Sequence, residues 1–220
     1  MLAQFVLFDG FDPLDVIAPF EVLDAGRLLT DGESTVELVC AEGARQVPSG
    51  MPAISLEATA RLDPDRADLV VVPGALGKLP DGPNDQRPDT IPMILARSLG
   101  TDLPALLREA VERTDTTVAT VCGGSLLPAM AGLIRGRSAT THRMAMDTLI
   151  ATGVNAIDAR VVDDGDLISA ASVTSGLDLG LYLLERELGP RIANAVEKLI
   201  AHERRGTVWR DTGHTPAIAT

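Results

Sequence analysis

Cys122 is the side chain in this sequence that is best suited to nucleophilic chemistry. It follows β-branched and small residues over 116–121 and precedes Gly123, Gly124 and an apolar run. This pattern predicts a buried strand, a sharp turn and a helix, the arrangement called a nucleophile elbow. A thiol there is expected to be shifted towards thiolate by the helix N-terminus, and the two glycines to adopt positive φ angles. The alternative is a buried cysteine that ends a strand beside an ordinary glycine-rich loop.

The carboxyl group of Asp15 is the second candidate. Asp12 is a suitable N-cap and Pro13 a suitable first residue for a helix predicted over 14–23. Asp15 lies in the first turn of that helix, where the helix dipole favours a carboxylate. Its role is therefore either proton transfer or simple charge complementarity at a helix start.

The loop that follows the strand predicted over 68–72 offers backbone groups to the site. It contains Gly74 and Ala75, small residues that allow a backbone to approach a ligand closely. The next region, 78–101, is rich in Pro, Asp and Gly before an apolar run. We expect this region to form a lid over the site.

Thr141 and His142 end a short strand predicted after the elbow. His142 is either a general-base partner of the thiol or a structural histidine at a strand terminus, and the structural role is slightly favoured. Cys40 ends an apolar run and is expected to be a core thiol.

Composition excludes several classes of function. The chain of 220 residues has 31 acidic and 19 basic side chains, a formal net charge of −12, which argues against electrostatic binding to nucleic acid or an anionic membrane. The two cysteines lack metal-binding spacing, so no metal is expected. We recognise no signal peptide and no apolar run long enough to span a bilayer, and therefore expect a cytoplasmic protein.

Strands and helices alternate along the chain, which predicts a mostly parallel sheet with helices on both faces. The predicted strands are 2–8, 36–40, 68–72, 116–121 and 138–141, with hairpins over 46–56 and 160–170. The predicted helices are 14–23, 103–113, 143–151 and 177–188, one after the elbow and one that ends near 201. We expect one domain over residues 1–203 and a C-terminal tail over 204–220.

Three blocks of the sequence resemble the ThiJ/PfpI superfamily. The cysteine block at 121–142 carries Val-Cys-Gly-Gly-Ser and Arg-Gly-Arg-Ser-Ala-Thr-Thr-His. The N-terminal block at 8–23 is similar to a branch that contains isonitrile hydratases and the amidase-like sensor domains of some transcription regulators. The late block at 175–189 resembles the family's late helix. The blocks occur in the family's order and cover most of residues 1–200.

The resemblance implies a class I glutamine amidotransferase-like fold, a flavodoxin-like three-layer α/β sandwich, usually assembled as a homodimer. It also implies that Cys122 is a nucleophile with Asp15 beside it, and that a small-molecule substrate is processed without a cofactor. The implied reaction is hydration of an isonitrile to an N-substituted formamide through a thioimidate on Cys122. Backbone N–H groups of Gly74, Ala75 and Gly123 would form an oxyanion hole. Gly123 stands where isonitrile hydratases commonly have threonine.

Two other functions remain open on the same resemblance. The first is a non-catalytic small-molecule or redox sensor, although too few residues follow the last predicted helix for a DNA-binding domain like that of the branch's regulators. The second is a glyoxalase-like activity on 2-oxoaldehydes. That group usually pairs the cysteine with an early glutamate, whereas the matching helix here carries Asp15.

Overall fold

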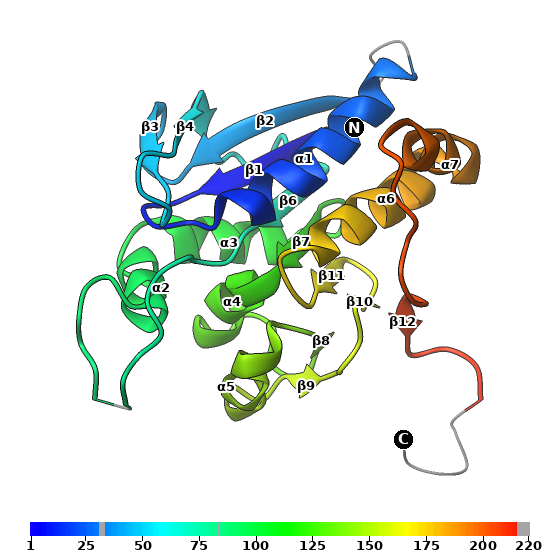
Figure 1. The fold of residues 1–220 in the computed structure, drawn as a ribbon. Helices are drawn as coiled ribbons and strands as arrows, with labels where there is room; N and C mark the ends of the chain where they lie inside the picture. The colour runs from blue at the N-terminus through cyan, green and yellow to red at the C-terminus, as the bar shows by residue number, and fades with distance from the viewer. Residues whose placement is uncertain (31–33, 83, 215–220) are drawn as a thin grey trace.

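A twisted sheet of eight strands forms the middle layer of the protein (Figure 1). The computed structural model describes residues 1–30, 34–82 and 84–214. The strands of this sheet are β1 (Leu2–Leu7), β2 (Thr35–Cys40), β5 (Ala60–Arg61), β6 (Leu69–Val72), β7 (Thr117–Val121), β10 (Val161–Asp163), β11 (Leu167–Ala170) and β12 (Trp209–Arg210). Their order is β12-β10-β11-β7-β6-β1-β2-β5. Every pairing is parallel except that of β10 with β11, which confirms the mostly parallel sheet.

The central strands are covered on both faces. All residues of β6 and β7 are buried, as expected for parallel strands that read as continuous runs of Val, Leu, Ala and Thr. The predicted hairpin over 160–170 is confirmed by the antiparallel register of Val162 opposite Ser169. These buried strands give the sheet a rigid centre, from which the connecting loops emerge.

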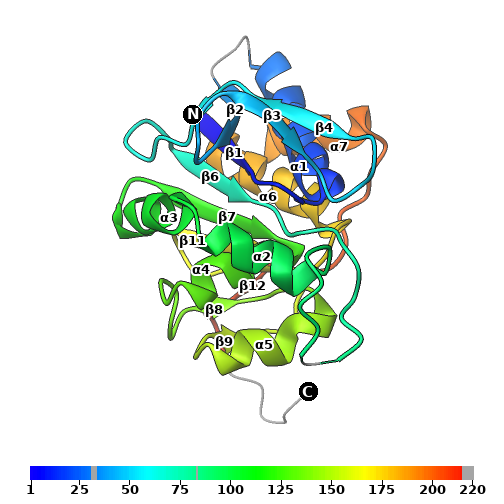
Figure 2. The ribbon, with the colours of Figure 1, turned by 90° about the vertical axis from the view of Figure 1, so that its left-hand side faces the viewer.

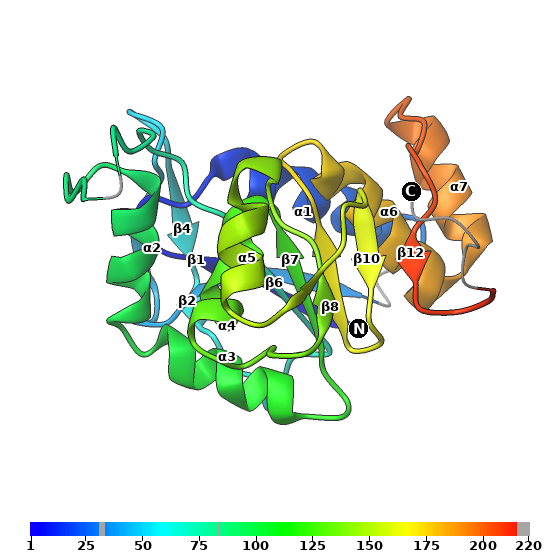
Figure 3. The same ribbon diagram turned by 90° about the horizontal axis from the view of Figure 1, so that it is seen from below.

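The helices form two groups, one on each face of the sheet (Figures 2 and 3). One group consists of α1 (Pro13–Leu28), α6 (Ser175–Leu188) and α7 (Pro190–Leu199). The other consists of α2 (Ile91–Leu99), α3 (Leu103–Glu112), α4 (Leu126–Met130) and α5 (Met146–Ala151). The fold is therefore a three-layer, flavodoxin-like α/β sandwich, as predicted.

Helix α1 begins as the sequence predicts and continues further. The Asp12 carboxylate accepts a hydrogen bond from the Leu14 amide at 3.0 Å, and Pro13 occupies the first turn. The helix continues past its predicted end at residue 23 to Leu28, where Gly26 allows it to pack closely on α6. A Cβ atom at Gly26 would lie 2.4 Å from a methyl carbon of Leu184.

Short elements complete the fold. Strands β3 (Arg45–Pro48) and β4 (Ser55–Ala58) form the small hairpin predicted over 46–56, and β8 (Ser138–Ala139) pairs with β9 (Asn155–Ala156). The region 78–101 was expected to form a lid. It contains helix α2, and its residue 83 lies outside the described residues. The chain after α7 returns to the sheet edge, where β12 pairs with β10.

In the described part of the chain, no helix combines the length and the apolar character needed to cross a bilayer.

Candidate active site

The predicted nucleophile and carboxyl group meet at one edge of the sheet. Cys122 follows β7, Gly74 lies in the loop after β6, and Asp15 lies two residues into the helix that follows β1. These three strands are neighbours in the sheet and run in the same direction. Loops after adjacent parallel strands emerge at the same edge, which is where ligands bind in open α/β sheets.

Cys122 itself adopts the strained backbone conformation of the elbow, with φ of +55°. The prediction that Gly123 and Gly124 would adopt positive φ angles is wrong, because neither does. A left-handed conformation costs a non-glycine residue about 1–3 kcal/mol and persists where the surroundings hold it in place. Here Thr141 contributes, because its Oγ1 donates to the Cys122 carbonyl oxygen at 3.0 Å.

Gly124 is needed for close packing rather than for its φ angle. A Cβ atom at Gly124 would lie 2.2 Å from the carbonyl oxygen of Val72, a distance that real Cβ contacts do not reach. At Gly123 a Cβ atom would have only the Gly74 Cα nearby, at 3.9 Å. The elbow thus presses against the end of β6 through Gly124 and leaves room for a side chain at Gly123.

The surroundings of Cys122 disfavour its thiolate form. Burial is the main cause that raises its pKa to about 12, and the nearby Asp15 carboxylate raises it further. Hydrogen bonds from the backbone of Gly123 and Val173 lower the pKa, but by less. The predicted shift towards thiolate is therefore opposite in direction to the raised pKa. The chain after Cys122 forms a 3₁₀ turn over Cys122–Ser125 and then only the five residues of α4, instead of one continuous helix behind the sulfur.

Asp15 is fully buried, with 0% of its surface exposed. Burial and the charge of Asp12 raise its pKa to about 8, against the lowering effect of hydrogen bonds with the Gly74 amide and the Cys122 thiol. Its Oδ2 accepts from the Gly74 N–H at 2.9 Å, while Oδ1 has no hydrogen-bond partner among the described residues. The side chain is thus a buried acid beside a thiol, held in place by the Gly74 amide.

The three predicted backbone donors lie in this site, but they are not equally available. The Gly74 N–H is bound to Asp15, and the Gly123 backbone lowers the pKa of the Cys122 thiol. Ala75 is buried in the same loop and pairs with Phe11 across an isolated bridge. In the resting site, therefore, the Gly74 N–H donates to the Asp15 carboxyl group and is not free to bind an oxyanion.

His142 occupies the structural position considered above. Its Nδ1 accepts from the Met144 amide at 3.3 Å and so caps the short 3₁₀ turn Arg143–Ala145. Thr141, its neighbour, is the residue that contacts the elbow. Of this pair, it is Thr141 that supports Cys122 directly.

Two groups of the site were not anticipated from the sequence. The backbone of Val173, in the turn between β11 and α6, lowers the pKa of the Cys122 thiol, and the charge of the Asp12 carboxylate raises it. The pKa of Asp12 is itself raised, mainly by burial. Because two carboxyl groups share this site, it favours a neutral substrate over an anionic one. Within residues 1–30, 34–82 and 84–214, no group of three or more His, Cys, Asp and Glu side chains is arranged to hold a metal ion.

Comparisons with known proteins identify the family of this chain. The model of the DJ-1/PfpI family matches residues 95–186. The chain is 30% identical to the isonitrile hydratase of Pseudomonas putida over 195 residues, covering 88% of this chain and 75% of the relative. It is 27% identical over 173 residues to Deglycase PfpI of Pyrococcus furiosus, covering 77% of this chain and 89% of the relative.

A solved structure shows the same fold. The crystal structure of a ThiJ/PfpI family protein from Pseudomonas syringae superimposes with a TM-score of 0.75 at 22% identity, covering 93% of this chain and 76% of the other. Together with the extent of the isonitrile hydratase match, the residues around Cys122 lead to one conclusion: this chain belongs to the DJ-1/PfpI family.

Proposed function

We propose that this protein is a cysteine-dependent hydratase that converts an isonitrile to an N-substituted formamide. The observation that carries the proposal is the buried Asp15 carboxyl group beside the Cys122 thiol, with one oxygen fixed by Gly74 and the other unpartnered. The 30% identity to the isonitrile hydratase of Pseudomonas putida supports the same reaction.

The protonation states of the pair suit an isonitrile. The terminal carbon of an isonitrile carries a lone pair, so this carbon accepts a proton before or while a nucleophile adds to it. With a pKa of about 8, Asp15 holds a proton at neutral pH and can act as the general acid. The neutral Cys122 thiol then needs a base, and the Asp15 carboxylate formed by that proton transfer is adjacent to it.

The first step is the addition of the thiol across the isonitrile carbon. Asp15 gives its proton to that carbon, the Cys122 sulfur forms the C–S bond, and the thiol proton passes to Asp15. The product is a thioimidate, R–N=CH–S–Cys122, with Asp15 protonated again.

Water completes the reaction. It adds to the thioimidate carbon while Asp15 exchanges protons with the water and the nitrogen, which gives a tetrahedral adduct, R–NH–CH(OH)–S–Cys122. Collapse of the adduct expels the thiol and releases R–NH–CHO. The sum is one isonitrile and one water consumed and one formamide formed, with both side chains returned to their starting states.

The backbone N–H groups of the site favour an isonitrile over a carbonyl compound as substrate. A 2-oxoaldehyde develops negative charge on oxygen when a thiol adds to it and needs backbone donors for that oxygen. The Gly74 amide is already bound to Asp15, and an isonitrile has no oxygen to stabilise. A glyoxalase-like or deglycase-like activity is therefore the second candidate, supported by the identity to Deglycase PfpI.

A panel assay separates these functions. Purified protein is incubated with cyclohexyl isonitrile or with methylglyoxal, and formamide or hydroxy acid is measured by chromatography. The Cys122→Ala variant removes the nucleophile, and Cys40→Ser is the matched control at the other cysteine. We expect formamide from the parent and from Cys40→Ser and none from Cys122→Ala. Hydroxy acid alone would favour the second candidate, and no product from either compound would favour a sensor.

A further inference from the structure

The segment that follows β8 holds the backbone of the reactive cysteine. The Thr141 Oγ1 donates to the Cys122 carbonyl oxygen at 3.0 Å, and Thr141 is buried. The direction of that carbonyl group follows from the backbone angles of Cys122, whose φ of +55° lies in the left-handed region. If Cys122 relaxed to a negative φ, its carbonyl group would turn away from Thr141. The hydrogen bond is therefore tied to the one backbone conformation that the elbow uses.

The conformation of Cys122 matters because the Asp15 carboxyl group lies against the elbow. A Cβ atom at Gly74 would lie 2.8 Å from the Asp15 Oδ2 and 2.8 Å from the Gly123 nitrogen, so both groups approach the same glycine. A left-handed residue is strained, and it persists where its surroundings hold it in place. Rotation about φ of Cys122 also swings its Cβ atom. A relaxed Cys122 would therefore carry its sulfur away from Asp15.

Thr141 is placed in turn by a hydrogen bond to β11. The Ser169 Oγ accepts from the Thr140 amide at 2.8 Å. Ser169 is fully buried, and it pairs in register with Thr120 of β7, two residues before Cys122. The strand that leads into the elbow and the strand that holds Thr140 are therefore direct neighbours in the sheet. This arrangement fixes the distance between the Thr141 hydroxyl and the Cys122 carbonyl group.

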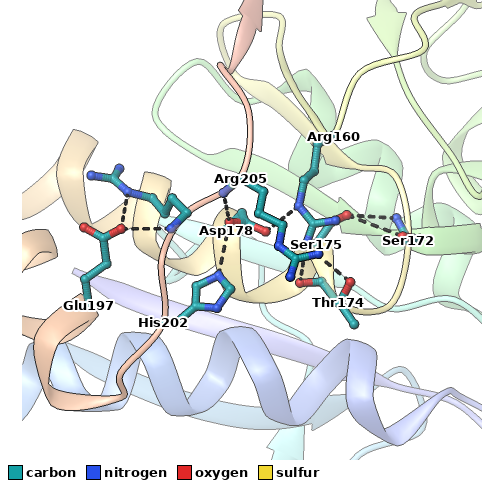
Figure 4. Close-up of polar contacts among 9 residues, drawn as sticks. Arg160, Ser172, Thr174, Ser175, Asp178, Glu197, His202 and Arg205 are labelled. Atoms are coloured by element: carbon teal, nitrogen blue, oxygen red, sulfur yellow. Dashed lines mark hydrogen bonds and ion pairs between the residues drawn. The ribbon is translucent and has the colours of Figure 1, made fainter.

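Strand β11 is itself fixed where it ends (Figure 4). The backbone carbonyl of Arg160, the residue before β10, accepts from the Ala171 amide at 3.0 Å. Its Nη2 donates to the Thr174 carbonyl oxygen at 2.9 Å, and its Nε donates to Oδ2 of Asp178 at 2.5 Å. Figure 4 shows that these contacts join the turn after β11 to the first turns of α6. Ser169 thus lies on a strand that is held along its length and at its end.

We propose that Thr141 is a positioning residue for the reactive cysteine: its hydroxyl group, placed by Ser169, keeps Cys122 in the left-handed conformation that holds the sulfur beside Asp15. The proposal rests on the nucleophilic role of Cys122 in the proposed function but not on the identity of the substrate. Thr141 acts through the Cys122 backbone and takes no part in bond making.

The chain offers two matched controls for the loss of the Thr141 hydroxyl group in Thr141→Val. Thr140 is the adjacent residue and is equally buried, and its Oγ1 has no hydrogen-bond partner in the part of the chain that the structure describes. Thr116 precedes β7, at the end opposite to Cys122, and its Oγ1 donates to the Ala67 carbonyl oxygen at 2.9 Å. Thr116→Val therefore removes the same kind of buried hydrogen bond far from the elbow. Thr141→Ser keeps the hydroxyl group and removes only the methyl group.

The test measures the reactivity of the thiol and needs no substrate. In a Cys40→Ser background, the rate of iodoacetamide labelling at Cys122 is measured from pH 7 to pH 9 for the parent and each variant. Burial and the Asp15 charge disfavour the thiolate in the elbow, so a sulfur that leaves this position should react faster. We expect labelling of Thr141→Val to be about fivefold faster, the factor that corresponds to one typical hydrogen bond. Thr141→Ser, Thr140→Val and Thr116→Val should react at the parent's rate.

Three results would overturn the proposal. Labelling of Thr141→Val at the parent's rate or slower would show that the hydroxyl group does not hold the elbow. Equal acceleration in Thr116→Val would mean general loosening of the fold. Equal acceleration in Thr141→Ser would mean that side-chain size, not the hydroxyl group, is what matters.

Ser169→Ala is the second variant, and it decides the outcome if Thr141→Val does not fold. It leaves every side chain of the elbow in place and removes the acceptor of the Thr140 amide. We expect faster labelling of Cys122 in this variant too, and an unchanged rate would contradict the role given to Ser169. Because labelling is independent of turnover, failure of the isonitrile assay does not affect this test.

Discussion

The backbone N–H of Gly74 donates to Oδ2 of Asp15 at 2.9 Å, a hydrogen bond that joins residues 59 positions apart in the chain. It ties the loop after β6 to the start of α1 and fixes a fully buried carboxyl group beside Cys122. It also explains the glycine, because a Cβ atom at Gly74 would lie 2.8 Å from that same oxygen. The relationship makes Asp15 the most informative residue to change.

Replacement of Asp15 by Asn is expected to remove turnover while the fold is kept. The Asn carbonyl oxygen can still accept from the Gly74 amide, but the amide side chain cannot deliver a proton to the isonitrile carbon. General acid catalysis contributes roughly 10²–10⁴-fold, so we expect formamide production from cyclohexyl isonitrile to fall by at least about 100-fold. Circular dichroism of the variant serves as the control for folding. An unchanged rate would remove Asp15 from the mechanism.

The same variant should be more stable than the parent at alkaline pH. Burial raises the pKa of Asp15 to about 8 from 3.8, so the folded state binds this proton more tightly than the unfolded state does. The contribution of Asp15 to stability is therefore complete below about pH 4 and is lost as the pH rises through about 8. In urea unfolding we expect the unfolding free energy of Asp15→Asn, relative to that of the parent, to rise by on the order of 5 kcal/mol between pH 4 and pH 9. A constant difference across that range would contradict the assignment.

Cys122 should be the first cysteine to react with iodoacetamide in the native protein. Cys40 is fully buried and donates to the Glu42 carboxylate and the Gly43 carbonyl, both at 3.1 Å, while Cys122 retains 9% exposure at the sheet edge. Burial raises the pKa of both thiols, so access decides the order. Peptide mapping after partial labelling gives the order directly, and faster modification of Cys40 would show that the elbow is closed.

The two glycines of the elbow should respond differently to substitution by alanine. The Cβ atom of Gly124→Ala would meet the Val72 carbonyl oxygen at 2.2 Å, and we expect a loss of roughly 3 kcal/mol or more of unfolding free energy. Gly123→Ala has open space, and its stability should stay within about 1 kcal/mol of the parent. Urea unfolding of both variants makes the comparison, and equal losses would mean that the elbow is not seated against β6 as described.

We also propose that the protein forms a homodimer in solution, as the family resemblance implies. Leu14 and Ile17 lie one turn apart on α1 and expose 47% and 41% of their surface, on either side of the buried Asp15. Light scattering at micromolar concentration is expected to give twice the mass of the 23.1 kDa chain. A single species of 23.1 kDa would contradict the dimer.

Much of the architecture was predictable because the central strands are locally unambiguous. The runs at 69–72 and 116–121 are apolar or β-branched throughout, and β6 and β7 are found there, fully buried. Two-residue strands such as β5 and β12 were missed, because a pairing of that length leaves no periodicity in the sequence. The extension of α1 to Leu28 was missed for a related reason, since it depends on tertiary packing of Gly26 against α6.

For the candidate site, the sequence predicted which side chains take part, but not their protonation or the backbone groups around them. The sequence signals indicated that Cys122 directly follows one strand and that Asp15 lies in the first turn of the helix after another. The sheet order then brings them together. The protonation of the pair depends on how deeply both are buried, which local sequence does not encode. Val173 contributes a backbone group rather than a side chain, so its residue type carried no signal.

Direct detection of the covalent intermediate tests the central claim that Cys122 adds to the isonitrile carbon. The Cys40→Ser protein is mixed with cyclohexyl isonitrile, quenched with acid within the first turnover, digested and analysed by mass spectrometry. The account predicts a peptide containing Cys122 that is heavier by one molecule of isonitrile, and the loss of this species in Cys122→Ala. Formamide production without any mass change on the Cys122 peptide, or turnover that persists in Cys122→Ala, would contradict it.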